Sequence, residues 1–440
     1  MQEAPFVLLT LTESLTLAFR ADILGSAFLT LALLMWIAVG IYALRYKDHQ
    51  ENNGRFFAFY ILTLVMLLGL SFAANYMTMY LFFEMMTLCS VPLVLHNGSA
   101  KANSAAKKYL FYSIFGATLG LIGLFFIHAY SVSSDFLPGG VLDAAKIAGN
   151  EELLRTVAFF AVMGFGAKAG LFPLHAWLPA AHPVAPSPAS AVLSGVITKA
   201  GVFCIIRVIY FQFGADFLRD TWVQRSWIAV ALLTILMGSL MAFREKQLKT
   251  RLAYSTVSQV SYVLLGLFFL NEAAFAGALL HVLYHSVLKD GLFLSAGNIL
   301  YQTRLEYVGD LKGLGRQMPR TLGCFAIFSL GLTGIPPFAG FLSKWELATG
   351  ALSSGLLPYA WLAPAVLLIS AMLTAGYLFP IVIHGFFPGQ AYRSERPDTG
   401  EAPAAMVGVV GALAAATVVL GLFGGPILKF FLDLAGTILL

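Results

Sequence analysis

The segment ALLHVLYHSVLKDGLFLSAGN (residues 278–298) places two histidines, a lysine and an aspartate inside an otherwise apolar run. The run is longer than the roughly 20 residues that a helix needs to cross a bilayer. His281, His285 and Lys289 follow one another at intervals of four, so a helix would present them on one face. Asp290 lies one step round from that face. The segment therefore predicts a membrane-spanning helix with a polar stripe directed at a protein interior.

The composition of the whole chain is that of a membrane protein. Of its 440 residues 59% are hydrophobic and only 11% are charged, against about 25% charged residues in soluble domains. Lipid can solvate the outer surface of such a chain, whereas a soluble protein could not bury so much apolar surface. The net charge of +5 does not indicate nucleic-acid binding, because the basic residues sit in short runs between apolar stretches. No cleavable signal peptide is expected, since no basic segment precedes the first apolar residues.

The apolar runs predict an all-α polytopic membrane protein with about twelve transmembrane helices. Segment 1–20 is not counted, because Glu13 and Arg20 interrupt it, and it is expected to be a short surface piece. The predicted spans are 22–45, 56–75, 76–96, 108–131, 155–179, 188–212, 227–243, 253–270, 273–301, 321–349, 357–386 and 404–431.

Lysine and arginine residues concentrate in alternate loops between the predicted spans. Positively charged loops face the cytoplasm in membrane proteins, so these loops predict the orientation of the chain. Both termini then lie on the outer side, as an even number of crossings requires, and the expected location is a prokaryotic cytoplasmic membrane. The basic residues of these loops are Arg45, Lys47, Arg55, Lys101, Lys107, Lys108, Arg244, Lys246, Lys249, Arg251, Arg304, Lys312, Arg316, Arg320, Arg393 and Arg396.

Several titratable residues lie inside predicted spans, where a charge costs a few kcal/mol unless it is paired, hydrated or functional. One buried basic residue can be a structural charge, and we assign Arg207 to that class because it lies close to a helix end. Four lysines lie inside predicted spans, Lys168, Lys199, Lys289 and Lys344, and the carboxylates at membrane depth are too few to pair them all. Because removing an amine from water favours its neutral form, such a row could pass protons. The candidates for proton translocation are Glu84, Lys168, Lys199, His281, His285, Lys289 and Lys344.

Two predicted spans contain proline breaks, and each break has a lysine beside it. Proline removes a helical hydrogen bond, and at membrane depth the freed carbonyl groups must find other partners. Pro173 follows Lys168 in the fifth span, and Pro337 precedes Lys344 in the tenth. An offset of five spans reverses the orientation of the second unit, which predicts two inverted five-helix repeats. The predicted divisions are 1–55 with the first transmembrane helix, 56–212 and 227–386 for the two repeats, and 404–440 for a C-terminal transmembrane helix.

The chain carries no motif for a bound cofactor or for catalytic chemistry. Its three cysteines, Cys89, Cys204 and Cys324, are far apart in sequence, which does not indicate an iron–sulfur or zinc site. It has no Gly-rich phosphate loop, no dinucleotide fingerprint and no Ser-His-Asp pattern. We therefore expect no cofactor, no metal and no catalytic residue in this chain.

Six stretches, in the expected order, resemble one superfamily of membrane subunits. It comprises the antiporter-like subunits of respiratory complex I, the D-type subunits of multi-subunit Na⁺/H⁺ antiporters and membrane subunits of energy-converting hydrogenases. The resemblance covers most of residues 22–350. The matching stretches are FFEMMTLCSVPLVL (82–95), GFGAKAGLFPLHAWLPAAH (164–182), LSGVITKAGVFCIIR (193–207), KQLKTRLAYSTVSQVSYVLLG (246–266), HSVLKDGLFLSAG (285–297) and GIPPFAGFLSKW (334–345).

The resemblance implies roles for the titratable residues. Glu84 and Lys168 would be the paired carboxylate and lysine of a first half-channel, and Lys199 would be a bridging lysine. His285 and Lys289 would lie on the polar axis of a second half-channel. Protons would then enter from the basic, cytoplasmic side and move along this axis.

The resemblance also implies that protons leave to the outside past Lys344. At three positions, however, the chain departs from the family pattern. Gln259 stands where some relatives have a titratable histidine, so that link would depend on water. Ala180 stands where many complex I members have aspartate, which favours the antiporter or hydrogenase branch. Asp290 is a further departure, and it could hold Lys289 charged.

The implied function is that of a proton-translocating subunit in a respiratory or energy-converting complex, which couples electron transfer to movement of H⁺ or Na⁺. The expected partners are the lipid bilayer, other membrane subunits of the superfamily and a peripheral redox module with iron–sulfur centres, and no nucleic acid. Two alternatives stay open: a D-type subunit of a secondary Na⁺/H⁺ antiporter without a redox partner, and a membrane anchor or energy-coupling subunit for a peripheral enzyme, as in inorganic-carbon uptake. No cluster of oxygen ligands stands out in the sequence, which favours H⁺ over Na⁺.

Overall fold

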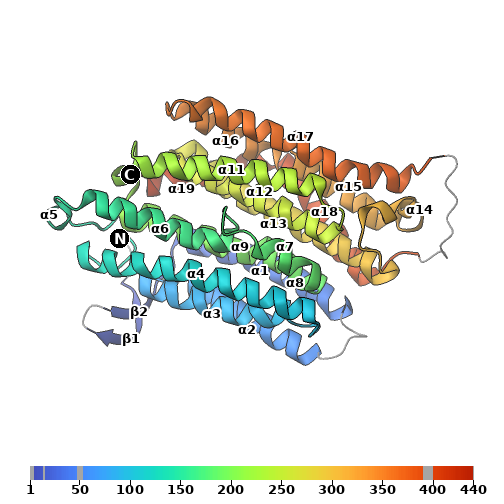
Figure 1. Ribbon diagram of the computed structural model, residues 1–440, viewed down its shortest axis with the longest axis horizontal. Helices are drawn as coiled ribbons and strands as arrows, with labels where there is room; N and C mark the ends of the chain where they lie inside the picture. The colour runs from blue at the N-terminus through green and yellow to red at the C-terminus, as the bar shows by residue number, and fades with distance from the viewer. Residues whose placement is uncertain (1–3, 13–14, 47–52, 390–399, 440) are drawn as a thin grey trace.

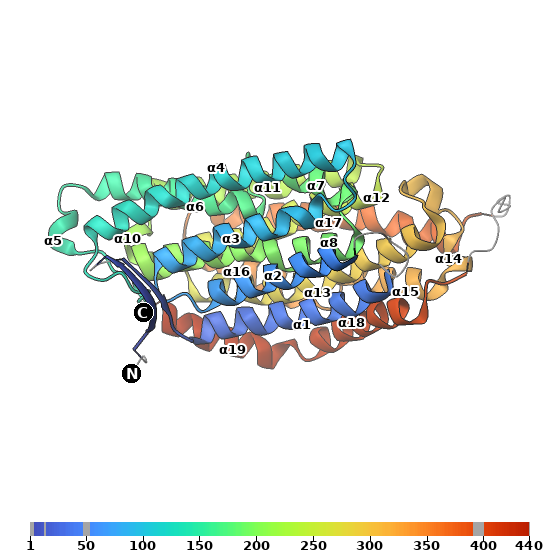
Figure 2. The same ribbon diagram turned by 90° about the horizontal axis from the view of Figure 1, so that it is seen from below.

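The computed structural model shows a bundle of long helices that run roughly along one axis (Figure 1). Both ends of the described chain lie at the same end of the bundle, as the predicted even number of crossings requires (Figures 1 and 2). Glu13, Lys47, Arg393 and Arg396, which entered the sequence-based predictions, lie outside the described residues. The structure describes residues 4–12, 15–46, 53–389 and 400–439.

The first half of the bundle leads up to a long central helical segment. Side chains cap the long helices α3 and α4: Asn75 accepts a hydrogen bond from Thr78 N, and Ser99 accepts one from Ala102 N. The helical elements are α1 (Ile23–Tyr46), α2 (Asn53–Ser71), α3 (Tyr76–Val94), α4 (Ala100–Tyr130), α5 (Ala144–Ile147), α6 (Glu151–Ala169), α7 (Trp177–Val184), α8 (Ser187–Val192), η1 (Leu193–Ile197), α9 (Thr198–Ile206) and η2 (Arg207–Phe213).

The central segment, residues 187–213, is a continuous helical rod made of α8, η1, α9 and η2. All of its residues are buried, which agrees with its apolar composition on every side. Its elements η1 and η2 are π-helical. Such stretches are uncommon and occur often at functional sites.

The second half is organised around α13, which packs against α12, α15, α16 and α18. Asn271 caps α13 by accepting a hydrogen bond from Ala274 N at 2.9 Å. The helical elements are α10 (Ala215–Leu218), α11 (Trp222–Arg244), α12 (Leu248–Phe268), α13 (Glu272–Thr303), η3 (Val308–Leu311), α14 (Leu314–Gln317), α15 (Pro319–Thr333), α16 (Phe341–Ser353), α17 (Tyr359–Phe386), α18 (Ala404–Leu422) and α19 (Gly424–Ile438).

The break predicted near Pro173 is confirmed. Helix α6 ends before Gly170, whose φ of 88° lies in the left-handed region that favours glycine. The chain then runs without regular helix until α7 begins at Trp177. The Trp177 indole N–H donates to Ala167 O at 2.8 Å, and this bond replaces a helical partner that the break removes.

The break predicted near Pro337 is confirmed as well. Helix α15 ends before Gly334, whose φ is 91°. The Lys344 amine, on α16, donates to Leu332 O at 2.6 Å and to Thr333 O at 2.9 Å. A cation at this position is favoured, because the last carbonyl groups of a helix carry partial negative charge.

The single helix predicted over 404–431 is wrong, because the chain divides there into α18 and α19. The Tyr284 hydroxyl donates to Leu420 O at 3.1 Å and takes the place of the next helical N–H. A Cβ on Gly424 would lie 2.4 Å from that hydroxyl, so the division needs glycine at this point. Pro426 follows and offers no N–H to continue the helix.

The described part of segment 1–20 is an antiparallel hairpin of β1 (Phe6–Thr12) and β2 (Leu15–Phe19). It lies at the same end of the bundle as both chain termini (Figure 2). Ala18 N donates to Thr78 Oγ1 at 2.9 Å, which attaches β2 to the start of α3.

Eight helices among the described residues are long and apolar enough to cross a membrane. The remaining predicted spans coincide with α6, α12, α13 and α15, which are shorter or carry polar interior residues. The chain is therefore a multi-pass integral membrane protein. The eight are α1, α2, α3, α4, the central segment 187–213, α11, α17 and α18.

Candidate functional site

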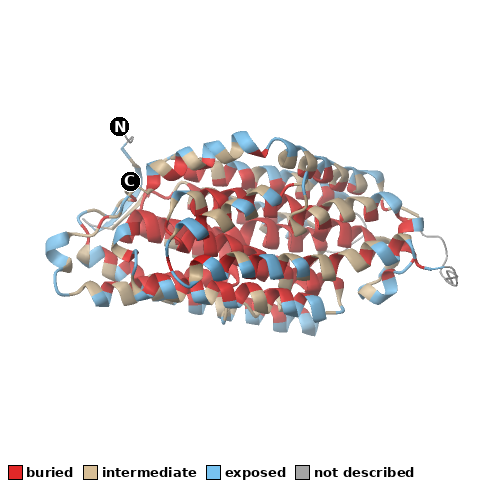
Figure 3. Ribbon diagram, turned by 90° about the horizontal axis from the view of Figure 1, so that it is seen from above, coloured by how far each residue is buried: buried red, intermediate tan, exposed pale blue. Residues whose placement is uncertain are grey.

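Buried residues concentrate at the middle of the bundle (Figure 3), and most of the predicted translocation residues are buried. All of them are buried except Glu84 and Lys344, which are partly buried. Five helices from both halves contribute to the set. The residues are Glu84 on α3, Lys168 on α6, Lys199 on α9, His281, His285 and Lys289 on α13, and Lys344 on α16.

Lys168 is held by hydroxyl groups of α4. Its amine donates to Tyr109 Oη at 3.0 Å and to Ser113 Oγ at 3.1 Å. The amine also lies 4.4 Å from the centre of the Tyr109 ring, a favourable position for a cation over an aromatic face. Tyr109 Oη is itself 2.7 Å from Ser90 Oγ on α3, so hydroxyl groups link Lys168 to the helix that carries Glu84.

Glu84 faces the same region but does not bind Lys168 directly. The two groups lie within electrostatic range of each other. No ion pair joins them among the described residues, and Glu84 Oε1 is buried without a hydrogen-bond partner. The structure therefore shows the Lys168 amine bound to neutral hydroxyl groups, while one carboxylate oxygen of Glu84 accepts no hydrogen bond from the described residues.

Close backbone contact brings α9 against α6. A Cβ on Gly201 would lie 2.7 Å from Phe165 O and 3.0 Å from Lys168 Cβ. The missing side chain thus lets the two helices approach at the level of Lys168. Because Lys199 lies two residues before Gly201, the same approach brings the two lysine-bearing helices together.

Lys199 is joined directly to the second half of the bundle. Its amine is 2.6 Å from His285 Nδ1 and donates to Ser194 O at 2.5 Å. An amine and an imidazole at this distance share one hydrogen bond, in which either nitrogen can hold the proton. This contact connects α9 with α13. The bridging role that the resemblance implies for Lys199 stays a prediction.

The buried polar groups that run from Lys168 through Lys199 to His285 form a polar array, and this array continues to Lys344. The His285 and His281 rings lie 6.0 Å apart, and His281 Nδ1 is 2.9 Å from Ser343 Oγ on α16. The His281 ring stacks on Tyr262 at 5.5 Å, and the Lys344 amine lies 5.2 Å from the centre of that Tyr262 ring. The gaps between these groups are short enough for one water molecule or a small rotation to bridge.

Lys289 extends the array towards α12. Its amine donates to Leu252 O at 3.0 Å and to Ser255 Oγ. Asp290, the next residue, points instead at Gly195 on η1. The two side chains therefore face different neighbours, as their spacing predicts, and Lys289 does not bind Asp290.

Two buried basic residues were missing from the predicted site. His182 is fully buried and stacks on Phe293 at 4.6 Å, and neither ring nitrogen has a hydrogen-bond partner in the part of the chain that the structure describes. Lys249 is buried at the start of α12 and donates to Ala185 O. His182 lies within electrostatic range of Lys249 and Lys289. The signal that could have found His182 is its place directly after a proline-broken span.

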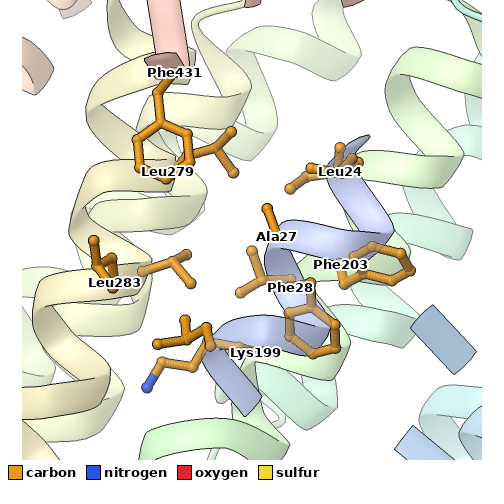
Figure 4. Close-up of a pocket in the computed structure, with 12 residues that line it drawn as sticks. Leu24, Ala27, Phe28, Lys199, Phe203, Leu279, Leu283 and Phe431 are labelled. Carbon is orange, nitrogen blue, oxygen red and sulfur yellow. The ribbon is translucent and has the colours of Figure 1, made fainter. Parts of the chain in front are cut away.

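Lys199 also borders an apolar cavity of about 70 Å³ between α1, α9, α13 and α19 (Figure 4). Its aliphatic stem lines the cavity together with Leu24, Phe28 and Leu283, and its amine points away from this apolar ring. The apolar surroundings keep the amine from bulk water on this side, so its protons must pass through the polar neighbours.

Arg207 belongs to a structural ion pair, as the sequence predicts. It is fully buried and its Nη2 donates to Asp22 Oδ2 at 2.5 Å. The rings of Phe136, Phe203 and Phe211 surround the guanidinium at about 5 Å. Because arginine stays protonated in proteins, this pair stabilises the packing and is unsuited to passing protons.

The chemistry that these groups permit is proton transfer. Amines, imidazoles and hydroxyl groups exchange protons readily when they lie within hydrogen-bond distance of one another. In the described part of the chain, no group of three or more His, Cys, Asp or Glu residues could hold a metal ion. The site therefore contains the kinds of group that proton transfer requires.

Known proteins resemble this chain in sequence and in fold. A model of the NADH:quinone oxidoreductase/Mrp antiporter transmembrane family matches residues 73–374. NADH-quinone oxidoreductase subunit N of Desulforudis audaxviator is 34% identical over 421 residues, which cover 93% of this chain and 82% of that protein. Hydrogenase-4 component B of Escherichia coli is 34% identical over 354 residues, 76% of this chain and 51% of that protein, so the chain spans about half its length.

A solved structure shows the same fold. A chain of the Mrp complex from Dietzia sp. DQ12-45-1b superposes with a TM-score of 0.85 at 22% sequence identity. The match covers 99% of this chain and 87% of that chain.

Proposed function

This chain belongs to the NADH:quinone oxidoreductase/Mrp antiporter transmembrane family, and on that premise we propose that it carries protons across the bilayer along its buried polar array. It is an antiporter-like membrane subunit, and its site residues are Glu84, Lys168, Lys199, His281, His285, Lys289 and Lys344. The observation that carries the proposal is the contact of 2.6 Å between Lys199 Nζ and His285 Nδ1. This contact joins the lysine of the central segment to the histidine stripe of α13.

A purely structural role explains this arrangement less well. A lysine that only stabilises a membrane bundle would pair with a carboxylate or with backbone carbonyl groups. Lys344 is bound in that way, by two carbonyl groups of α15. Lys199 also donates to one carbonyl group, Ser194 O, but in addition it shares a hydrogen bond with the titratable imidazole of His285, whose other nitrogen has no hydrogen-bond partner among the described residues. An anchor for a peripheral enzyme would not need that contact.

Protons enter from the basic end of the bundle in this proposal. Lys249 lies at the start of α12 beside the basic loop, and a small cavity there is lined also by Gln247 and Glu306. From Lys249 the buried ring of His182 leads towards Lys289. The proton then reaches the array and leaves on the opposite side past Lys344.

The Glu84–Lys168 pair is the proposed switch. In the observed state the Lys168 amine is bound by Tyr109 and Ser113, which corresponds to an open pair. Bringing two charges to about 4 Å at an effective dielectric constant near 20 changes the energy by roughly 4 kcal/mol. Moving one charge against about 100 mV costs about 2.3 kcal/mol. The energy change on closing or opening the pair therefore exceeds the cost of moving one charge, so the pair can gate the passage of one proton.

The proposed topology has twelve crossings of a prokaryotic cytoplasmic membrane. Residues 56–212 and 227–386 form two inverted five-helix repeats, and their broken helices occupy matching positions. Two observations support this: both breaks lie at a glycine with positive φ, and each has a lysine beside it. The first helix and the C-terminal segment flank the repeats.

The energy for transport comes from partner subunits in this proposal. The chain acts with other membrane subunits of the superfamily and with a peripheral redox module that contains iron–sulfur centres. Purifying the native complex through a tag on this chain and identifying its subunits by mass spectrometry tests this part. Redox subunits support coupling to electron transfer, whereas antiporter subunits alone would make the chain part of a secondary Na⁺/H⁺ antiporter.

Proton flux in proteoliposomes tests the function itself. The native complex is reconstituted, a K⁺ diffusion potential is imposed with valinomycin, and internal pH is followed with a dye. Lys344→Ala should abolish the flux while the complex still assembles, and Lys101→Ala, an exposed lysine on α4, should leave it unchanged. Undiminished flux in an assembled Lys344→Ala complex would remove Lys344 from the path.

A further inference from the structure

Asp290 is a buried carboxylate that the pathway above does not use. It lies on α13, is fully buried, and has no hydrogen-bond partner on either oxygen among the described residues. It follows Lys289 directly in sequence, yet Lys289 points to α12 and Asp290 points to η1. A buried carboxylate that accepts no hydrogen bond requires a physical explanation.

The backbone around Asp290 is shaped to receive it. A Cβ on Gly195 would lie 1.9 Å from Asp290 Oδ1 and 2.9 Å from Oδ2, so the carboxylate occupies the space that a side chain would fill. One turn earlier on α13, Ser286 Oγ donates to Gly195 O at 2.6 Å. This bond fixes α13 against η1 and holds the carboxylate over the π-helical turn.

Lys199 is the charged group opposite Asp290. It lies one turn after Gly195 in the central segment and within electrostatic range of the carboxylate. Its amine already contacts His285, so Asp290 and His285 approach the same lysine from one helix. The other titratable groups nearby are Tyr60 on α2, Tyr42 on α1, His182 on α7, and Lys289 on α13 itself.

A metal cation does not suit this place. Two carbonyl oxygens of the adjoining turn already accept hydrogen bonds, Ser194 O from Lys199 and Gly195 O from Ser286. No other carboxylate joins Asp290 in a metal-binding group among the described residues. A bare ionised carboxylate away from water is strongly disfavoured, so the group needs a proton or the neighbouring ammonium.

We propose that Asp290 is a proton-binding site that exchanges its proton with Lys199, an inference that rests on the proposed function. In the step, one N–H bond of the Lys199 ammonium breaks and an O–H bond forms on Asp290, which leaves a neutral amine and a neutral acid. The pair has no net charge before or after the transfer. Lys199 can thus become neutral without sending its proton onward, and the amine is free to accept the next proton from its neighbours.

The exchange gives the centre of the array a store for one proton. When a further proton reaches the neutral pair, the site gains a single charge, and His285 offers the way out. Asp290 would therefore set how long Lys199, which joins the two halves, stays protonated. This is the role proposed for Glu84 towards Lys168.

Infrared spectroscopy on the reconstituted complex tests the proposal directly. The wild-type complex should show the C=O stretch of a protonated carboxylic acid that shifts in D₂O, and Asp290→Asn should remove it. Glu272→Gln, at an exposed acid on the same helix, should leave the band in place. Proton flux in Asp290→Asn should fall by about 10-fold, in the range of losses that follow removal of a proton-transfer group.

The possible outcomes separate this inference from the proposed function. If Lys344→Ala abolishes flux while Asp290→Asn keeps both the band and the flux, the inference fails and the proposed function stands. If both variants keep full flux, the proposed function fails and the inference with it. A band lost with unchanged flux contradicts exchange with Lys199, and a band that appears only when Na⁺ is removed contradicts a proton site.

A second variant covers the case in which Asp290→Asn does not assemble. Lys199→Gln keeps a hydrogen-bonding side chain but removes the exchange partner. It should change the pH at which the carboxylic acid band disappears. A band with the same pH dependence in Lys199→Gln and in the wild type contradicts the pairing.

Discussion

Lys199 Nζ lies 2.6 Å from His285 Nδ1, and this contact joins the two halves of the protein at the middle of the bundle. One partner stands on the central buried segment and the other on the stripe of α13. On either side the array differs in character. Lys168 is bound by hydroxyl groups, whereas Lys344 is bound by carbonyl groups at a broken helix. In the proposed function, this contact is the point at which the two halves exchange a proton.

Glu84→Gln should stop coupled transport without disturbing assembly. The substitution keeps the shape of the side chain but removes the charge that attracts the Lys168 amine away from Tyr109. We expect coupled transport to fall by about 100-fold, measured with the pH dye in proteoliposomes. Glu272→Gln, at an exposed position, is the matched control. Normal coupling in Glu84→Gln would show that the carboxylate is no part of a switch.

His182→Ala should slow proton uptake at the basic end. His182 is buried and lies within electrostatic range of Lys249 and Lys289, so its removal leaves a gap between them. Flux should decrease by about 10-fold, and added imidazole should restore part of it by filling the gap. His384→Ala, at an exposed histidine, is the control. Equal flux in both variants would place the uptake route elsewhere.

Gly201→Ala should destabilise the protein. The new Cβ would lie 2.7 Å from Phe165 O, a backbone atom that cannot move aside without shifting α6. Overpacking of this kind costs about 1–3 kcal/mol. Thermal unfolding in detergent should therefore begin at a lower temperature. Gly411→Ala is the control, because no atom lies within 4 Å of its Cβ, and it should unfold at or above the wild-type temperature.

Asp22→Asn should cost stability that a second substitution restores. It leaves the fully buried Arg207 without its charged partner. We expect a loss of about 2 kcal/mol, below the 3–5 kcal/mol typical of buried pairs, because the Asp22 side chain is 30% exposed. The double variant Asp22→Asn with Arg207→Met should recover most of this loss in chemical unfolding. No recovery would mean that the pair is not what stabilises this region.

Much of the fold followed from local sequence features. Apolar runs near 20 residues predicted the long helices, and Pro173 and Pro337 marked both broken ones, because proline has the same local effect in any surroundings. The division between α18 and α19 was not predicted. It depends on the Tyr284 hydroxyl, which comes from a distant part of the chain.

The site was predicted in composition more than in geometry. Spacing along one helix indicated that Lys289 and Asp290 face different neighbours, and the structure agrees. The partners of Lys168 could not be predicted, because they depend on how α4 packs against α6. His182 was missed because a lone histidine gives no periodic signal; its place after a proline-broken span was the one hint, and its burial appears only in the structure.

The proposed link between the halves is tested most directly by proton flux in Lys199→Ala, His285→Ala and the double variant, all in reconstituted complex under the same imposed potential. Because both residues serve one transfer, each single variant should lose about as much flux as the double variant. Losses in the double variant equal to the product of the two single losses would mean that the residues act independently. That result would contradict a proton path through the Lys199–His285 contact.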